Sequence, residues 1–435
     1  MQDHFVSLHR VKTVASSLAS LSDRAVVTAA LGLALAARLA AVFAVSNFQS
    51  VTGYENEEIA LNLLAGHGYA MKHFSGMEPT AFMYPLYSFF LAGHFLIFGH
   101  QWAPVEVTQA LIGAVGAGLI FYLGRRLFDR TTGIIAAFIY AVYPIYVYWS
   151  TQGQALELEV ALLMALLLCW HKGLERGGAG LAVISGFLLG LGSLSKTLYL
   201  AFFPSFFIWS LLLPKRNTGQ VLRFSALVLG VALFTIAPWT IRNAMVFHRF
   251  ILVTANSGFN LWLGNNPHAT GSLYTPEGRH IASTISPELA AEVRSAGDNA
   301  ARDDVFKREA RRFIRENPGA FFRLMPRRLY ALWYFEPYAP SRFGLFRSAS
   351  YLFILPFALA GMALARGRIR EHSIFYLMYA TITVIYSVYF GQARFRFVEE
   401  WSFILFAAFA VTMGLRRAGW LSPQLAARSR DSEAT

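Results

Sequence analysis

Long apolar runs separated by short charged segments constrain the fold of this chain more than any other feature. Hydrophobic residues make up 55% of the 435 residues and charged residues only 14%, whereas a soluble domain carries about 25% charge. A helix needs about 20 apolar residues to cross a bilayer. We therefore expect an all-α polytopic membrane protein, in which lipid covers the surplus of apolar surface.

Ten of the runs have the character of transmembrane helices. An eleventh, 84–98, is shorter and is followed by Gly-His-Gln, so it is either a further span or a helix in the interface. The first run is too long for the core of a signal peptide and lacks a convincing cleavage site, so we expect an uncleaved first span. The ten expected spans are residues 25–47, 105–124, 131–149, 155–170, 179–194, 197–213, 221–239, 350–365, 373–390 and 401–415.

Positive charge decides how residues 84–98 are placed, because loops rich in Lys and Arg stay on the cytoplasmic side. If 84–98 does not cross, the basic clusters after the second, fourth, sixth, eighth and tenth spans all lie on the side of the basic N-terminus. We therefore expect ten spans, both termini in the cytoplasm, and 84–98 as an interfacial helix. The short outer segments then keep only Lys72, Lys196, Arg394 and Arg396.

This topology divides the chain into five parts. Residues 1–24 form a cytoplasmic N-terminus, and 25–239 form a transmembrane module whose first outer loop is 48–104. A large outer loop follows at 240–349, with 15 basic and 9 acidic residues, extended segments near 250–254 and 260–263, and a charged helix over 303–316. Residues 350–417 are C-terminal transmembrane helices, and 418–435 are a cytoplasmic tail.

The composition excludes several classes of protein. The net charge is +13, but the basic residues flank apolar runs instead of covering one soluble face with interleaved aromatics, which argues against nucleic acid. They suit anionic lipid head groups instead. Cys169 is the single cysteine, so no internal disulfide forms, and the sequence has no Cys/His metal-binding spacing.

An acidic cluster follows the first span on the expected outer face. Glu55 and Glu58 are three residues apart and share one side of a helix, while Glu57 points away. Such carboxylates suit a general base for an acceptor hydroxyl, or ligands of a divalent cation. The structural alternative is acidic capping of a helix over 55–65.

Isolated cations near the outer ends of spans form a second candidate group. They are candidate phosphate ligands, because Arg presents a donor fork that matches phosphate oxygens. The structural alternative is pairing with the internal carboxylates of Glu157, Glu159, Glu399 or Glu400. The candidate cations are Lys196, Arg242, Arg394 and Arg396.

The segment 256–267 combines amides, glycines and an indole, groups that hydrogen-bond to and stack on a sugar. Glycine and asparagine also build turns, which is the structural alternative. We interpret His94 and His171 as structural, whereas Arg38 in the first span calls for a partner on another helix. The candidate sugar contacts in this segment are Asn256, Asn260, Trp262, Asn265 and Asn266.

Together these clusters resemble the bacterial lipid-linked-sugar glycosyltransferases of GT-C type, near the protein O-mannosyltransferases and the lipid A aminoarabinose transferase (glycosyltransferase family 39-like). The resemblance runs from about residue 54 to 400. It is carried by residues 54–69 (Tyr-Glu-x3-Ile-Ala-x3-Leu-x-Gly-x-Gly-Tyr), 79–87 (Pro-Thr-Ala-Phe-x2-Pro-Leu-Tyr), 238–243 (Pro-Trp-Thr-Ile-Arg-Asn), 258–267 (Gly-Phe-Asn-Leu-Trp-Leu-Gly-Asn-Asn-Pro) and 394–396 (Arg-Phe-Arg).

The resemblance implies transfer of a hexosyl or pentosyl group from a polyprenyl-phosphate donor to a periplasmic acceptor, with inversion. A carboxylate of the first outer loop acts on the acceptor, directly or through a metal held by Glu55 and Glu58, and basic residues stabilise the departing phosphate. Metal use differs within the family, so the cofactor stays open. Within the matching segments, Tyr54, His67, Tyr69 and Tyr87 are further candidates for sugar or acceptor contacts.

Three positions depart from the family pattern. The aspartate of the aminoarabinose type would fall at Thr52, which leaves open whether Glu55 or Glu58 does the work. Met83 stands where the family has a lysine, so a basic contact must come from elsewhere, and Glu78 is a second acid with weak support. The 32 Arg against 6 Lys and the family indicate a bacterial inner-membrane protein with a periplasmic active site.

Two other classes of function compete with the enzyme. An O-antigen ligase or polymerase also has many spans and a basic outer loop, but it relies on late-loop Arg and His and would not need Glu55 and Glu58. A transporter or flippase of lipid-linked substrates would show charge at mid-bilayer depth and paired repeats of broken helices, which we do not find. The expected partners are the lipid-linked sugar, a glycan, lipid or protein acceptor, and the bilayer.

Overall fold

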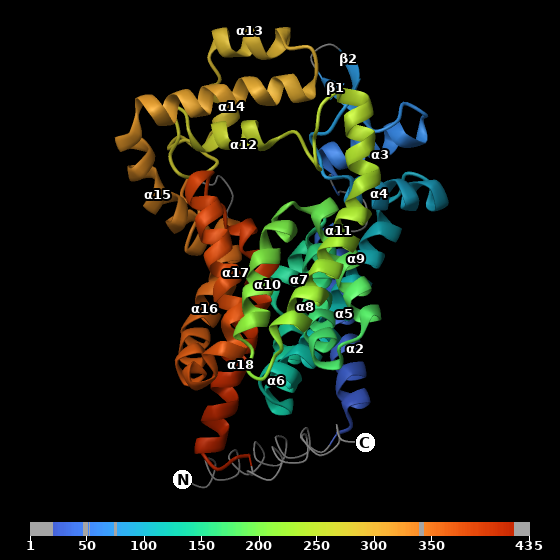
Figure 1. Cartoon of the computed structure of the whole chain (residues 1–435), viewed down its shortest axis with the longest axis vertical. Helices are drawn as coiled ribbons and strands as arrows, with labels where there is room; N and C mark the ends of the chain where they lie inside the picture. Colours follow the sequence, from blue (N-terminus) through green and yellow to red (C-terminus); the bar gives the residue numbers. More distant parts are fainter. Residues whose placement is uncertain (1–20, 47–50, 52, 74–75, 339–342, 422–435) are drawn as a thin grey trace.

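Helices dominate the chain, which forms a long bundle with a head of shorter elements at one end (Figure 1). The computed structural model describes residues 21–46, 51, 53–73, 76–338 and 343–421. Thr52 and most of the expected N-terminal segment and C-terminal tail lie outside these residues. The all-α fold class is confirmed.

Each expected span coincides with helix. The run 131–149 is split, because Pro144 removes a backbone donor and holds Tyr143 in an extended conformation. The helices are α2 (Asp23–Val45), α5 (Trp102–Leu127), α6 (Arg130–Ala141) with α7 (Pro144–Trp149), α8 (Leu156–Arg176), α9 (Ala179–Ser195), α10 (Leu198–Leu212), α11 (Thr218–Phe247), α16 (Phe343–Leu364), α17 (Ile369–Val388) and α18 (Phe397–Arg417).

Fewer of these helices meet a strict criterion of length and apolarity. Within the described part of the chain, α2, α5, α11 and α18 are long and apolar enough to cross a membrane. The pair α16–α17, bent by 63° at the short break η2 (Arg366–Arg368), would make a fifth if it is one span. The chain is thus a multi-pass membrane protein by its helices, and the number ten stays a prediction.

The first outer segment consists of small elements packed on one side of α11. It contains α3 (Tyr54–Leu64), a hairpin of β1 (Ala70–His73) and β2 (Gly76–Pro79), and α4 (Pro85–Phe98). The strands pair antiparallel with Ala70 opposite Pro79. Helix α4 is too short for a span and leaves Leu96 and Ile97 largely exposed, which suits the expected interfacial helix.

The second outer segment is more helical than expected. The stretch 260–263 was expected to be extended but lies in α12, and in the described residues between α11 and α16 the one β contact is an isolated bridge between Tyr274 and His280. The charged helix begins at Asn299, capped by the Asp298 carboxylate, and ends before Pro318. The elements are α12 (Ser257–Gly264), η1 (Ile281–Thr284), α13 (Pro287–Ser295), α14 (Asn299–Glu316) and α15 (Pro318–Trp333), and η3 (Ala393–Phe395) lies between α17 and α18.

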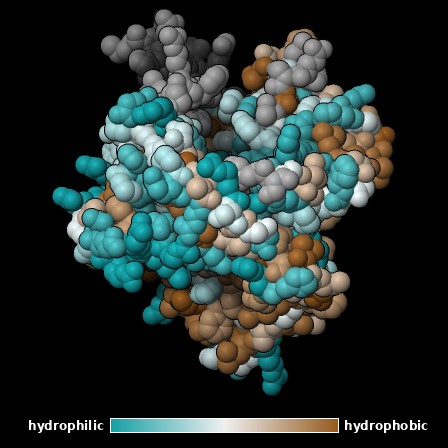
Figure 2. Space-filling model, turned by 90° about the horizontal axis from the view of Figure 1, so that it is seen from above, coloured by the Kyte–Doolittle hydropathy of each residue, from teal (hydrophilic) through white to brown (hydrophobic). Residues whose placement is uncertain are grey.

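The surface of the head is largely hydrophilic when seen from above, with hydrophobic residues gathered towards one edge (Figure 2). Beneath this surface, one apolar core extends through the bundle from α2 to α18. Another apolar core lies in the head around Trp262, Ile281 and Phe306.

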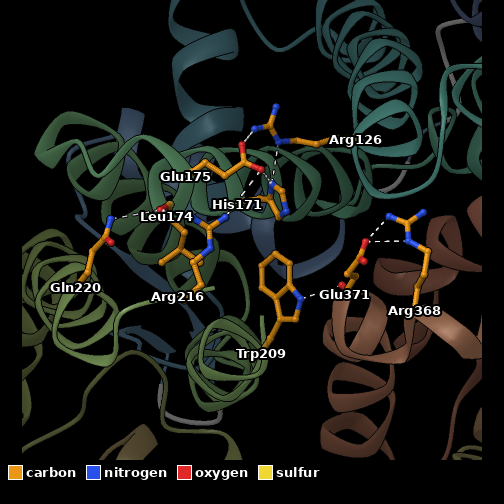
Figure 3. A network of polar contacts seen from close by, with 9 residues as sticks. All are labelled: Arg126, His171, Leu174, Glu175, Trp209, Arg216, Gln220, Arg368 and Glu371. Carbon is orange, nitrogen blue, oxygen red and sulfur yellow. Dashed lines mark hydrogen bonds and ion pairs between the residues drawn. The ribbon is translucent and has the colours of Figure 1, made fainter. Parts of the chain in front are cut away.

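The opposite end of the bundle, where α6 begins and α18 ends, is tied together by a polar network (Figure 3). Glu175 pairs with Arg126 and, at 4.0 Å, with Arg216, and the His171 ring stacks on Trp209. The Trp209 indole donates to the Glu371 carbonyl of α17 at 2.9 Å. His171 therefore has structural partners, as we interpreted it.

Arg38 pairs with Glu157, which answers the question its sequence position raised. Its Nε lies 3.5 Å from Glu157 Oε1, and its Nη1 donates to the Ala141 carbonyl at 3.2 Å. Both side chains are essentially fully buried. Gly113 leaves room for this pair, because a Cβ there would lie 2.3 Å from Arg38 Nε and 2.4 Å from Glu157 Oε2.

We expect Gly113→Ala to lower the stability of the protein by about 1–3 kcal/mol, since overpacking would force the Arg38–Glu157 pair apart. The measurement is thermal unfolding of the purified protein in detergent. Gly230→Ala in α11 is the matched control, because nothing lies within 4 Å of its added methyl group. It should be neutral or stabilising by up to about 1 kcal/mol. Equal melting temperatures for both variants would contradict this role of Gly113.

Candidate functional site

The three glutamates that follow Tyr54 have different surroundings. Glu57 accepts from the Gly53 amide at 3.0 Å, from His100 Nε2 at 2.7 Å and from Trp102 Nε1 at 3.1 Å. It therefore fastens the start of α3 to the turn before α5. This carboxylate has a structural task.

Glu58 is also engaged by the backbone. Its Oε1 accepts from the Lys72 amide at 2.5 Å, which joins α3 to β1. Its charge acts on His73, whose pKa is lowered first by burial and then by Arg302, whereas Glu78 and Glu58 raise it. Glu58 thus positions the hairpin.

Glu55 differs from both neighbours. It is half-buried, and within the described residues its carboxylate makes no hydrogen bond or ion pair. Ile59, one helical turn later on the same face of α3, packs into an apolar cluster that includes Tyr84 and Leu194. The free carboxylate therefore lies on the face that α3 turns towards the junction of α9 and α10.

A polar cluster occupies that junction. Lys196 Nζ lies 3.8 Å from Glu159 Oε2 and 5.5 Å from the ring centroid of Phe395. Ser195 Oγ donates to Glu159 Oε1 at 3.2 Å, and the Thr197 hydroxyl donates to the Tyr84 hydroxyl at 3.3 Å. Lys196 is therefore held on one side by Glu159 of α8. Thr197, the next residue, is held by Tyr84 at the start of α4.

Burial lowers the pKa of Lys196, and Arg394 lowers it further, whereas the Glu159 and Glu399 carboxylates raise it. Lys196 keeps 16% of its side chain exposed. Arg394 is half-buried, lies over the Phe395 ring at 5.4 Å, and makes no hydrogen bond or ion pair to any described residue. Glu399 is fully buried, and its carboxylate oxygens have no hydrogen-bond partner in the described structure.

Arg242 is taken up by the backbone of the first outer segment. Its guanidinium donates to the Thr80 carbonyl at 2.8 Å and the Tyr69 carbonyl at 2.9 Å, and it lies 4.9 Å from the Trp239 ring centroid. These contacts clamp both ends of the β hairpin to α11. The structure therefore gives Arg242 a structural task instead of the expected phosphate contact.

Arg396 is fully buried and donates to the Leu332 carbonyl at 2.7 Å. Its Nε lies 3.3 Å from Glu400 Oε2, and Glu400 accepts from the Tyr143 hydroxyl at 2.5 Å. This side chain joins α18 to α15 and to the α6–α7 break. These contacts match the structural alternative for Arg396, pairing with an internal carboxylate, and a phosphate contact by this residue stays a prediction.

The Asn-rich segment follows the turn alternative for most of its members. The Asn265 amide donates to the Leu261 and Val388 carbonyls, and the Asn266 amide donates to the Trp262 carbonyl. The Asn256 amide donates to the Phe82 carbonyl at 2.7 Å, and Trp262 is buried in the core of the head. These contacts give four of the five candidates structural roles, namely Asn256, Trp262, Asn265 and Asn266. The fifth, Asn260, is half-exposed, and its side chain makes no such hydrogen bond within the described residues.

The aromatic candidates of the first outer segment divide in the same way. Tyr69 is buried against Trp239, and burial raises its pKa. The buried Tyr87 donates to Gln109 Oε1 at 2.6 Å. Tyr54 and His67 are exposed and can be reached from solvent.

Glu78 pairs with Arg302 through two contacts of 2.7 and 3.1 Å, which tie β2 to α14. Its weak candidacy as a second acid therefore gives way to a structural pairing. His94 also has structural partners, with the Phe90 carbonyl at 2.8 Å and the Thr108 hydroxyl at 3.0 Å from its ring nitrogens.

Comparison with known proteins agrees with this architecture. Residues 77–241 match the family model of dolichyl-phosphate-mannose-protein mannosyltransferases. The apo oligosaccharyltransferase of Archaeoglobus fulgidus is similar in structure, with a TM-score of 0.60 at 14% identity over 92% of this chain and 51% of that chain. The chain has a GT-C fold.

The same archaeal oligosaccharyltransferase in complex with an inhibitory peptide and a dolichol-phosphate gives a TM-score of 0.58 at 14% identity, over 91% of this chain and 50% of that chain. The chain thus spans about half the length of these GT-C structures. No curated protein matches its sequence. The resemblance to GT-C type glycosyltransferases that the sequence predicted is confirmed.

Sequence reasoning named Glu159 among four carboxylates that could pair with the cations, and the structure places it 3.8 Å from Lys196; which carboxylate meets which cation was left open. The available signal was the acidic pair Glu157 and Glu159 at the start of an apolar helix. Residues two apart point to different sides of a helix, and here one carboxylate meets Arg38 and the other meets Lys196.

The expected metal alternative finds little support in the first outer segment. Among the described residues, no group of three or more His, Cys, Asp or Glu side chains could hold a metal ion. Glu58, one of the two candidate ligands, already accepts from the Lys72 amide.

We expect the three glutamates of α3 to differ in their effect on stability. Glu57→Ala should lower the free energy of unfolding by about 1–3 kcal/mol, because it leaves a buried amide and indole donor unpaired. Glu58→Ala should act in the same direction, whereas Glu55→Ala should stay within about 0.5 kcal/mol of the parent protein. Thermal unfolding of the three variants measures this, and a Glu55 variant as unstable as the Glu57 variant would contradict the assignment.

Proposed function

We propose that this GT-C protein transfers a sugar from a polyprenyl-phosphate donor to an acceptor on the outer face of the membrane by a single inverting displacement. The observation that carries the proposal is that Glu55 makes no hydrogen bond or ion pair within the described residues, while Ile59, one turn later on α3, shares an apolar cluster with Leu194, two residues before Lys196. A base and a phosphate-binding pair at one end of the bundle are the two halves of this reaction.

In the proposed reaction the acceptor hydroxyl attacks the anomeric carbon of the donor sugar. A new carbon–oxygen bond forms to the acceptor while the bond from the anomeric carbon to the phosphate oxygen breaks. Glu55 takes the acceptor proton, and the electron pair of the broken bond leaves with the polyprenyl phosphate. The configuration at the anomeric carbon is therefore inverted.

Lys196 and Arg394 stabilise the departing phosphate in this proposal. Negative charge grows on the leaving oxygen in the transition state, so fixed cations aimed at that position lower the barrier. Met83 stands where the family has a lysine, and Lys196 supplies this basic group in the proposal. The two positions lie close together, because their neighbours Thr197 and Tyr84 share a hydrogen bond. The Glu159 carboxylate holds the lysine from the protein side, and the buried Glu399 acts on it only through its charge.

The proposal also includes further contact residues, a membrane location and a substrate class. Tyr54, His67 and Asn260 are exposed or half-exposed and suit contacts to the acceptor or the sugar. The proposed bacterial inner membrane rests on the 32 Arg against 6 Lys and the family resemblance, and the cytoplasmic termini and outer site rest on the charge pattern. The sugar, hexose or pentose, and the acceptor, glycan, lipid or protein, are to be identified by mass difference.

We expect Glu55→Gln to abolish sugar transfer, with a fall of about 10²–10⁴-fold in rate, because the amide cannot accept the acceptor proton. The measurement compares glycans and lipids by mass spectrometry in a strain that lacks the gene and carries either the parent or the variant protein. The matched control is Glu316→Gln at the exposed end of α14. Asn62→Asp in α3 would not serve as a control, because Asn62 is buried. Full transfer by the Glu55 variant would contradict the proposed base.

We expect the affinity for a polyprenyl phosphate to depend on the protonated Lys196. The pKa of Lys196 is lowered. Binding that needs the positive charge of this lysine is therefore present at low pH. As the pH rises, this binding is lost earlier than it would be with an ordinary lysine. Lys196→Arg should move this alkaline loss upwards, since arginine stays charged, and Lys196→Met should weaken binding by about 10–100-fold. Binding of fluorescent polyprenyl phosphate across pH measures both.

Lys72→Met is the control for that measurement, because Lys72 is exposed on β1 and its side chain makes no ion pair within the described structure. It should bind the polyprenyl phosphate as the parent protein does. If Lys196→Met also binds normally at every pH, Lys196 is not a phosphate ligand.

A further inference from the structure

Helix α15 has one face that the described residues leave uncovered. Its buried side consists of Leu324, Arg328, Ala331 and Leu332. At about 100° per residue, the exposed residues occupy a continuous stripe about 140° wide. We call this the α15 stripe, and it consists of Phe322, Arg323, Pro326, Arg327, Tyr330 and, just past the last turn, Tyr334.

The stripe combines exposed aromatic rings with arginines that have no partner. Phe322 is 63% exposed, and the rings of Tyr330 and Tyr334 stack with centroids 5.8 Å apart. Neither Arg323 nor Arg327 makes a hydrogen bond or ion pair to any described residue. Helix α15 contains no Asp or Glu, so the stripe combines apolar and aromatic side chains with positive charge only.

Helix α15 is fixed to the outer end of one expected span, α17. Arg328 donates to the Ser387 carbonyl in the last turn of α17 at 2.7 Å, and Trp333 Nε1 donates to Thr383 Oγ1 at 3.0 Å. The chain then continues from α15 towards the start of α16. Figure 1 shows α15 on the flank of the bundle opposite α4 and at a similar height.

These observations name the kind of surface that covers the stripe. Aromatic residues gather at the level of lipid head groups, and helices with an apolar face and Arg or Lys beside it lie in the membrane interface. Two unpaired arginines add attraction to anionic head groups, which present phosphate oxygens for the guanidinium fork. We propose that the α15 stripe lies in the head-group region of the outer leaflet and binds anionic phospholipid there.

The role of the stripe does not depend on sugar transfer. It fixes the height of the head above the bilayer, because α15 connects α14 to the outer ends of α16 and α17. A partner protein on this face is the competing occupant, and it would leave the stripe in water in the purified protein.

The first experiment places a fluorophore on the stripe in the full-length protein. Tyr330→Cys is made in a Cys169→Ser background, labelled with bimane and reconstituted in nanodiscs that contain lipids dibrominated near the head-group end of their acyl chains. Glu288→Cys, a fully exposed position on α13 of the head, is the control. We expect several-fold stronger quenching at position 330 than at 288, and equal quenching at the two positions would overturn the proposal.

The second experiment tests the arginines. With the label at position 330, brominated phosphatidylglycerol should quench several-fold more than equally brominated phosphatidylcholine at the same mole fraction. The double variant Arg323→Gln/Arg327→Gln should reduce this ratio to near one. Arg366→Gln/Arg370→Gln, an equal change of charge at the opposite end of the bundle, should leave the ratio unchanged.

A preference for phosphatidylglycerol that survives in the Arg323→Gln/Arg327→Gln variant would show that the stripe does not recognise the anionic head group. Both experiments use the label at position 330; the first compares two label positions, and the second compares two lipids with and without the arginines. Neither readout uses glycosyl transfer, so a failure of the proposed function would not change these results.

Discussion

The ion pair between Arg38 and Glu157 is the interaction on which the arrangement of the bundle depends. A buried pair gains attraction only by giving up the hydration of both charges, so it stabilises a fold less than its Coulomb energy suggests, and loss of one partner is costly. Here the pair fixes α2 against the first turn of α8 and, through the Ala141 carbonyl, against the end of α6. Gly113 of α5 makes the approach possible. Both charges are fully covered, so a transported substrate would not reach them.

The same first turn of α8 then reaches the proposed site. Glu157 meets Arg38 inside the bundle, and Glu159, two residues on, meets Lys196 at the junction of α9 and α10. The structure therefore couples a stabilising pair and a functional pair through one helical turn. A change at Arg38 would be felt at Lys196 without any contact between them, because the backbone of α8 is common to both.

The sequence could predict those parts that follow from local patterns. Apolar runs of sufficient length became helices at every expected position, and the break at Pro144 follows from the chemistry of proline. The assignment of partners could not be predicted in this way. Arg242 and Lys196 have the same type of position in the sequence, yet Arg242 finds two backbone carbonyls of the hairpin and Lys196 finds a carboxylate that leaves part of it exposed. Only the packing of residues 69–80 against α11 separates the two cases.

The three glutamates of α3 show why a cluster of like residues is a weak predictor of the catalytic one. A carboxylate that accepts two or three hydrogen bonds from fixed donors, as Glu57 does from Gly53, His100 and Trp102, is held in its place. A general base needs the opposite condition, with free lone pairs that face the acceptor. Glu55 meets this condition because its neighbours two and three residues on take up the nearby donors. The acidic run thus serves both alternatives at once, with capping by Glu57, bracing of the hairpin by Glu58, and Glu55 left open for chemistry.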